Sequence, residues 1–453
     1  MSPVTPHPST AVAHEILDHY LAEWAEAVAR GLRGARPAEE GEEEPAPVRV
    51  VYADGFCNSG GRHSLVGPGR AAAGAGSALR GVRALERLAA RAPGARAGLH
   101  ATAVLVEEDP AEVDRLERTL DAAGLGARVR RTDDPAGLAA GEVGLVQAGL
   151  AEAAEGVGRA LAAADHALCF LAPPAAGKLP LAVVRSLAAR GADLLVAFPH
   201  AELLKQARWR GSTLADLPSH ARQQVDGYSA LFGDARYEWL PLWREAERAG
   251  GAGEAEARMV ERYAARLAEI PGRTLKRLPV HLSDEPADSL YLFLLAADPA
   301  GALWLNRAVR EAGVADRADL DRAFRAEEAP AEEAVLELFA PEEGGDGPLA
   351  PPGERPADTA RLARTLVERF RGRTVPYGEV LRGLADTDLT GDEVRRAMAA
   401  LKRTGEAAYR SLSGPAAEVE FPEVPVVPAR RRAARARPAD LPLLAGLETD
   451  PAE

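Results

Sequence analysis

The feature that most constrains the fold of this chain is an alternation of short apolar runs and helical segments between residues 48 and 198. Short apolar strands that are each followed by a helix are typical of a parallel sheet with helices on both faces. Hydrophobic residues make up 47% of the chain and charged residues 27%, a globular composition. The sequence therefore predicts an α/β fold. The predicted strands are 48–52, 102–106, 127–131, 167–171 and 193–198, with helices at 78–90, 110–123, 150–164 and 179–190.

The segments on either side of this region extend the same unit. One apolar stripe predicts a helix over 11–32; it consists of Ile16, Leu17, Tyr20, Leu21, Trp24 and Val28. Further helices are predicted at 200–208, 218–231 and 254–269, followed by strands at 274–282 and 289–297 that form an antiparallel hairpin. Five parallel strands and a hairpin are the strand sequence of class I methyltransferases, which are Rossmann-like. We therefore expect a sheet of order 3-2-1-4-5-7-6.

A second unit follows a stretch rich in Pro, Gly, Glu and Ala. It has predicted helices at 359–371, 377–384 and 390–404 and strands at 407–412 and 417–421, which is winged-helix order. Thr390 and Glu393 have capping-box spacing and predict where the third helix begins. The predicted domains are an N-terminal helix and connector (1–47), a methyltransferase-like α/β domain (48–326), a linker (327–356), a winged-helix domain (357–424) and a basic Pro/Arg-rich tail (425–453).

The net charge of the chain limits how it could contact nucleic acid. Lys and Arg total 55 against 68 Asp and Glu, a net charge of −13, so contact with DNA or RNA needs a local basic patch. The third helix and wing of the winged-helix domain offer such a patch, made of Arg395, Arg396, Lys402, Arg403 and Arg410. The alternative is that this domain docks a protein or is purely structural.

The cysteines and the hydropathy pattern point to the cytoplasm. The chain has two cysteines, Cys57 and Cys169, which suits a reducing compartment, and no set of Cys and His has zinc spacing. No uncharged stretch approaches the roughly 18 residues of a membrane helix. Because the first and fourth strands are neighbours, the two cysteines could form a redox-sensitive pair; the alternative is that Cys169 is a small core residue.

Acidic residues and glycines gather where the predicted strands end. In a doubly wound sheet, the loop after the first strand lets the backbone approach a nucleotide-like ligand, and an acid after the second strand accepts hydrogen bonds from ribose hydroxyls. An acid after the third strand could reach an adenine. The alternative is that these acids begin helices, where they stabilise the helix dipole. The candidates are Asp54, Gly55, Asn58 and Gly60 after the first strand, Glu107 after the second, and Asp133 or Asp134 after the third.

Several segments, in this order, carry a resemblance to a known family. They are the N-terminal helical stripe, Tyr52-Ala53-Asp54-Gly55-Phe56, Val104-Leu105-Val106-Glu107, and Leu231-Phe232-Gly233 with Trp239. Over residues 11–313 the chain resembles the three-Cys-motif partner family, which is similar to class I S-adenosylmethionine-dependent methyltransferases. Its members are similar to proteins encoded beside a small protein that contains the three-cysteine motif. The resemblance implies that such a protein is a partner and that S-adenosylmethionine is the cofactor, held by Asp54, Gly60 and Glu107.

The chain departs from the family pattern at two places. Cys57 and Asn58 stand where the family tends to read Ala-Gly, and Ala172 stands where an acid would orient the methyl acceptor. The catalytic residues therefore stay unassigned, with Lys178 and His200, after the fourth and fifth strands, as the candidates. Two functions stay open. One is a methyltransferase that modifies nucleic acid, and the other is a non-catalytic protein that binds nucleic acid or a protein through its winged helix.

Overall fold

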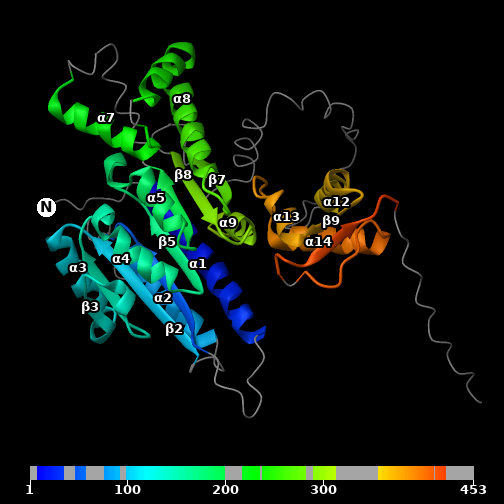
Figure 1. Ribbon diagram of the computed structural model, residues 1–453, viewed down its shortest axis with the longest axis horizontal. Helices are drawn as coiled ribbons and strands as arrows, with labels where there is room; N and C mark the ends of the chain where they lie inside the picture. The colour runs from blue at the N-terminus through cyan, green and yellow to red at the C-terminus, as the bar shows by residue number, and fades with distance from the viewer. Residues whose placement is uncertain are drawn as a thin grey trace, which may run out of the picture.

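The computed structural model contains an α/β unit and a smaller C-terminal unit (Figure 1). It describes residues 8–34, 46–57, 76–91, 98–198, 217–234, 237–281, 289–312, 356–412 and 414–424. The predicted helix at 200–208 lies outside the described residues. Within the described part of the chain, no helix is long and apolar enough to cross a membrane.

The α/β unit is built on a mixed, mostly parallel sheet of order β3-β4-β2-β1-β5-β6-β8-β7. The strands from β3 to β6 in this order are all parallel, and β8 runs antiparallel to both β6 and β7. This confirms the α/β fold and the closing hairpin. The strands are β1 (Val48–Asp54), β2 (Leu99–Glu107), β3 (Val129–Arg131), β4 (Val143–Gln147), β5 (His166–Leu171), β6 (Asp193–Phe198), β7 (Thr274–His281) and β8 (Ser289–Ala296).

The predicted sheet order is wrong in one respect, because it omits β4. The predicted third strand exists as β3, but it has only three residues and forms the outer edge of the sheet. The neighbour of β2 is instead β4, whose Gln147 pairs in register with Glu107. The apolar content of the two strands agrees with this placement, since Val143, Leu145 and Val146 of β4 are buried on both faces of the sheet while the β3 residues are half-buried or exposed.

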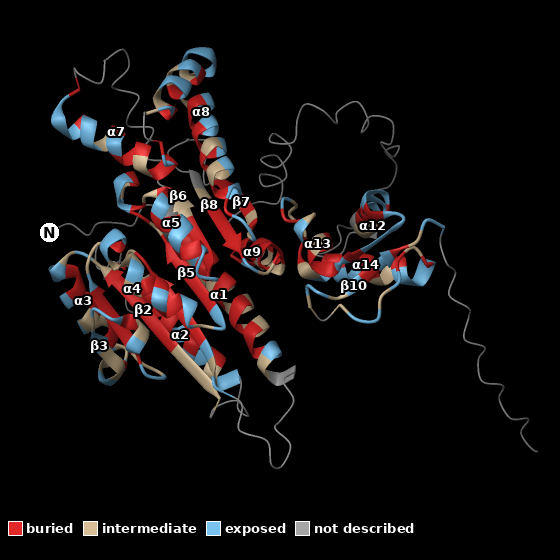
Figure 2. Cartoon of the chain, viewed as in Figure 1, coloured by how far each residue is buried: buried red, intermediate tan, exposed pale blue. Residues whose placement is uncertain are grey.

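Helices cover both faces of the sheet. On one face lie α1 (Pro8–Gly34), α2 (Ser77–Arg91), α3 (Pro110–Ala122) and α9 (Ala300–Glu311). On the other lie α4 (Leu150–Ala162), α5 (Leu181–Ala188), α7 (Ser219–Phe232) and α8 (Trp239–Ala268). Because strand side chains alternate, Val50 and Tyr52 of β1 point to the first core and Val51 and Ala53 to the second. The buried strands between two helical layers are visible in Figure 2.

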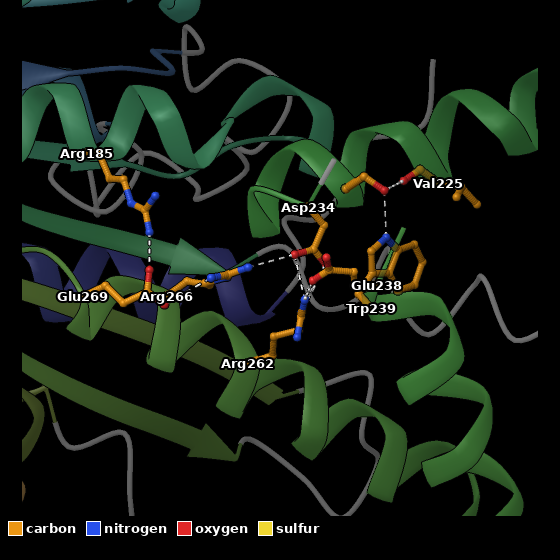
Figure 3. A network of polar contacts seen from close by, with 9 residues as sticks. Arg185, Val225, Asp234, Glu238, Trp239, Arg262, Arg266 and Glu269 are labelled. Atoms are coloured by element: carbon orange, nitrogen blue, oxygen red, sulfur yellow. Dashed lines mark hydrogen bonds and ion pairs between the residues drawn. The ribbon is translucent and has the colours of Figure 1, made fainter. Parts of the chain in front are cut away.

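The second helical layer is held together by a polar network (Figure 3). The carboxylate of Asp234, which is fully buried, accepts hydrogen bonds from Arg262 at 2.7 and 2.8 Å and from Arg266 at 3.3 Å. Trp239 Nε1 donates to Ser229 Oγ at 2.9 Å and so ties the start of α8 to α7. The helix α8 bends at Gly251, which has a φ of 83° that favours glycine.

The C-terminal unit has its own core. Its elements are α12 (Pro356–Phe370), β9 (Arg373–Pro376), α13 (Tyr377–Arg382), α14 (Gly391–Thr404) and β10 (Glu418–Phe421). The three predicted helices are confirmed, and so is the capping box, in which Glu393 accepts from the Thr390 N–H at 2.7 Å. The predicted strand at 407–412 is wrong, because that segment makes one isolated bridge, Ala408 with Glu420. The winged-helix assignment stays a prediction.

Three side chains of the α/β unit bind three consecutive backbone carbonyls, those of residues 387–389, which we call the carbonyl latch. Lys276 Nζ and Asn306 Nδ2 donate to Thr387 O at 2.8 and 2.7 Å. Asn306 Nδ2 also donates to Leu389 O at 2.7 Å, and Arg310 donates to the carbonyl between them at 2.6 Å. The latch precedes α14, so it fixes that helix against α9.

Candidate cofactor site at the carboxyl ends of the central strands

The site follows from the topology of the sheet. The helix after β1, α2, lies on one face, whereas the helix after β5, α5, lies on the other. The chain therefore changes direction between β1 and β5, which are neighbours. In open α/β sheets, ligands bind outside the carboxyl ends of the strands at such a switch point. Asp54 ends β1 and Glu107 ends β2, so both predicted acids lie at this edge.

Asp54 is completely buried. Its Oδ1 accepts a hydrogen bond from the Phe56 N–H at 3.1 Å, but among the described residues its Oδ2 has no hydrogen-bond partner. Burial raises the pKa of this carboxyl, while its polar neighbours lower it, Ser77 first and then the Phe56 N–H, Cys57 and Tyr52. A buried acceptor with an unused oxygen is costly, and such groups call for a partner. Asp54 is therefore placed to accept a further hydrogen bond at the end of β1.

Glu107 lies beside Asp54 because the chain after β1 continues along the end of β2. The Cys57 N–H donates to Val106 O at 2.9 Å, which brings Cys57 next to Glu107. Glu107 is half-buried, and its Oε1 accepts from the Asp109 N–H at 2.9 Å. Burial raises the pKa of Glu107, while the backbone N–H groups of the next two residues lower it. The two carboxyls thus flank Cys57 at the ends of two adjacent strands.

Asp109 shows that the helix-start interpretation holds for one acid of this segment. It is the N-cap of α3, where its Oδ1 accepts from the Ala111 N–H at 2.8 Å and Pro110 occupies the first turn. The Asp109 carboxylate is therefore used by the helix.

Gly55 has a steric role in the structure. A Cβ on this residue would lie 2.6 Å from Leu171 Cδ2 and 3.0 Å from Leu150 Cδ2, so a larger residue would require these leucines to shift. Its N–H donates to Phe170 O at 2.9 Å. The glycine thus lets β1, β5 and the start of α4 pack together, and its part in cofactor binding stays a prediction.

Asp133 lies one strand farther out than the sequence suggested. It is exposed and follows β3, so β4 separates it from Glu107. Ala148 and Gly149, which follow β4, occupy the edge position next to Glu107 and carry no charge. Asp134 is exposed and pairs with Arg159 at 3.2 Å. An adenine contact by Asp133 stays a prediction that the strand order does not favour.

The remaining residues predicted at this edge divide into two groups. Lys178 lies in the 3₁₀ helix η4 (Ala176–Lys178) after β5, and its Nζ is 2.7 Å and 2.8 Å from the carboxylate oxygens of Glu108. Sequence reasoning missed Glu108 as its partner, because the pairing depends on which strands are neighbours. Asn58, Gly60 and His200 lie outside the described residues.

The two cysteines do not form the expected pair. Cys169 belongs to the core between the sheet and α4, α5, α7 and α8, whereas Cys57 belongs to the core on the opposite face. Both are free and buried, and burial raises the pKa of each thiol. Because the thiolate is the reactive form, both cysteines are core residues of low reactivity.

The basic residues predicted to bind nucleic acid are all exposed, but they lie in different surroundings. Arg395, near the start of α14, pairs with Asp392. Lys402, in its last turn, donates to Tyr409 O at 2.6 Å and lies 4.3 Å from the centre of the Tyr409 ring. The start of α14 is docked on α9, since Glu393 accepts from Arg310 at 3.0 Å. The patch predicted from the sequence is thus divided, with Arg395 beside the docked start of α14 and Lys402, Arg403 and Arg410 near its other end.

No metal site is formed by the described residues, since among them no group of three or more His, Cys, Asp or Glu is arranged to hold an ion.

Comparison with known proteins gives structural matches only. The chain matches no protein-family profile and no curated protein. It is similar to E. coli YjhP, at 14% identity over 61% of this chain and 92% of that one, with a TM-score of 0.20. It is also similar to S-adenosylmethionine-dependent methyltransferases from Thiobacillus denitrificans and Geobacter sulfurreducens, both solved with S-adenosyl-L-homocysteine. Each is 13% identical over 60% of this chain and 89% of the other, with TM-scores of 0.20 and 0.21.

Proposed function

We propose that the α/β unit is a class I methyltransferase-like domain that binds S-adenosylmethionine at the carboxyl ends of β1 and β2. The observation that carries this proposal is the pair of carboxyls, Asp54 and Glu107, on either side of Cys57 at the switch point. Ribose hydroxyls donate hydrogen bonds to carboxylates, and an acidic edge also favours the positively charged sulfonium. When bound, S-adenosylmethionine would supply an activated methyl group.

Ala172, just after β5, leaves that position without an acid to orient an acceptor. We propose nucleic acid, or material bound by a three-Cys-motif protein partner, as the acceptor. This follows the family resemblance and the basic end of α14. Burial of Asp54 and the Phe56 N–H keep one carboxyl fixed at the site whichever acceptor is used.

Calorimetric titration of the full chain with S-adenosylmethionine and S-adenosylhomocysteine tests this function. We expect saturable binding that the Glu107→Ala variant weakens at least about tenfold, the loss of one or two hydrogen bonds to a charged group. Glu155→Gln is a matched control, because Glu155 is 82% exposed on α4 and pairs with Arg159 away from the site. Equal binding by native and Glu107→Ala protein would refute the proposed site. Binding only by an Asn58→Gly variant would mean that the native chain does not use this cofactor.

A second function is supported by the end of α14. Lys402, Arg403 and Arg410 are exposed there together with the half-buried ring of Tyr409. A non-catalytic protein could bind nucleic acid or a protein partner through this surface while the start of α14 stays docked. Electrophoretic shift assays with single-stranded and duplex DNA and RNA test this surface, and a shift by a chain that does not bind S-adenosylmethionine would favour the non-catalytic function. Charge reversal at Lys402 and Arg403 should abolish a shift in the second case, and Arg395→Ala should not.

A further inference from the structure

The ion pair between Lys178 and Glu108 joins the ends of the two strands that flank β1 at the proposed cofactor site. Glu108 follows β2 and Lys178 lies in η4 after β5, and these two strands flank β1. Neighbouring strands are about 4.8 Å apart, so the pair spans about 10 Å across the end of β1. The Nζ to Oε distances of 2.7 and 2.8 Å show that both side chains extend toward each other.

The turn that carries Lys178 is held rigidly. Gly227 of α7 packs against Gly177, so closely that a Cβ on Gly227 would lie 2.9 Å from the Gly177 nitrogen. The Lys178 N–H also donates to Ala175 O at 3.0 Å. The backbone of η4 is therefore fixed at the β5 side of the edge, while the Lys178 side chain is 47% exposed and can change partner.

Among the described residues, the charged groups at the ends of β1 and β2 are acids. Asp54 ends β1, Glu107 and Glu108 lie at the end of β2, and Lys178 reaches Glu108 from the β5 side. Beyond β2, Ala148 and Gly149 are uncharged, but the carboxylates of Glu108 and Glu152 lie against Gly149, 3.6 and 3.9 Å from where its Cβ would be. A ligand whose ribose lies at Glu107 would thus have Lys178 as the cation within reach among the described residues.

We propose that Lys178 binds the carboxylate of the amino-acid arm of S-adenosylmethionine and that Glu108 holds Lys178 in place until the ligand arrives. This inference rests on the proposed function. An ion pair between half-exposed side chains contributes little to stability, so exchanging Glu108 for a ligand carboxylate costs little. Lys178 is then a residue that selects nucleosides carrying an amino-acid arm, and Glu108 competes with the ligand for it.

Two ligands that differ in the amino-acid arm test whether Lys178 binds its carboxylate. S-adenosylhomocysteine carries the carboxylate, whereas 5′-methylthioadenosine has the same nucleoside and lacks it. We expect Lys178→Met to weaken S-adenosylhomocysteine binding to the full chain about tenfold and to leave 5′-methylthioadenosine binding within about twofold. Glu108→Gln should strengthen S-adenosylhomocysteine binding about threefold in the native background and not in the Lys178→Met background. Arg159→Met, on the exposed face of α4, is the control.

The outcomes distinguish this inference from the proposed function. If both ligands bind and Lys178→Met changes neither affinity, or weakens both equally, the role of Lys178 is refuted and the proposed site stands. If neither ligand binds the native chain, both proposals fall. Thermal melting of each variant checks that its fold is unchanged, as expected for two exposed side chains.

Discussion

Replacing Asn306 by alanine removes the central contact of the carbonyl latch. The Asn306 side chain is buried in α9 and donates two hydrogen bonds of 2.7 Å, to Thr387 O and to Leu389 O. Each hydrogen bond contributes about 1 kcal/mol net, and a buried carbonyl left unpaired adds a further cost. The substitution should therefore lower the free energy that holds α14 on α9 by about 2–3 kcal/mol. Thr387 O keeps its bond from Lys276 Nζ, which limits the loss at that carbonyl.

Hydrogen exchange measures this loss where it occurs. Because Leu303 of α9 is part of the C-terminal core, undocking also weakens that core. We expect the most protected amides of α14 to lose about 30- to 150-fold of their protection in the Asn306→Ala variant, the equivalent of 2–3 kcal/mol. Thr365→Ala is the control, because it removes only an exposed hydrogen bond from Thr365 Oγ1 to Arg361 O on α12. It should change the protection of the α14 amides less than about threefold. Protection in Asn306→Ala within threefold of the native value would refute the reasoning that the latch holds α14.

Two further predictions concern buried carboxyls. Burial raises the pKa of Asp193 to about 7, although its Oδ1 accepts from the Ala297 N–H, so the folded protein keeps a proton that the unfolded chain releases near pH 4. This group therefore removes up to about 4 kcal/mol of stability as pH rises from about 4 to about 7, and unfolding at several pH values should show a smaller decline for Asp193→Asn. Asp234→Ala strips Arg262 and Arg266 of a fully buried carboxylate and should lower the unfolding free energy by about 3 kcal/mol in urea titrations. A loss below about 1 kcal/mol would contradict the structural role given to that network.

The core of the fold could be predicted because burial leaves a periodic trace in the sequence. The apolar stripe of α1 and the runs of β1, β2, β5 and β6 were found within a few residues of their bounds. The strand β4 was missed because it is only five residues long and Gly144 interrupts its apolar run. Its omission moved Asp133 one strand too close to the site.

Contacts between units leave no comparable trace. The carbonyl latch is made by backbone oxygens of residues 387–389, whose side chains carry no signal of it. By contrast, the sequence could place Asp54 and Glu107 at the edge of the sheet, because each residue comes just after a predicted strand. The pairing of Lys178 with Glu108 could not be predicted, because it depends on two loops that meet only in the folded chain. Gly55 was assigned to a ligand because its steric neighbours, Leu150 and Leu171, are distant in sequence.

Hydrogen exchange with and without saturating S-adenosylhomocysteine tests the central claim, that the cofactor binds at the carboxyl ends of β1 and β2, most directly. We predict that the ligand slows exchange at residues 54–57 and 106–109 and leaves α12 and α14 unchanged. Slower exchange confined to the C-terminal unit, or no change anywhere despite saturation, would contradict it.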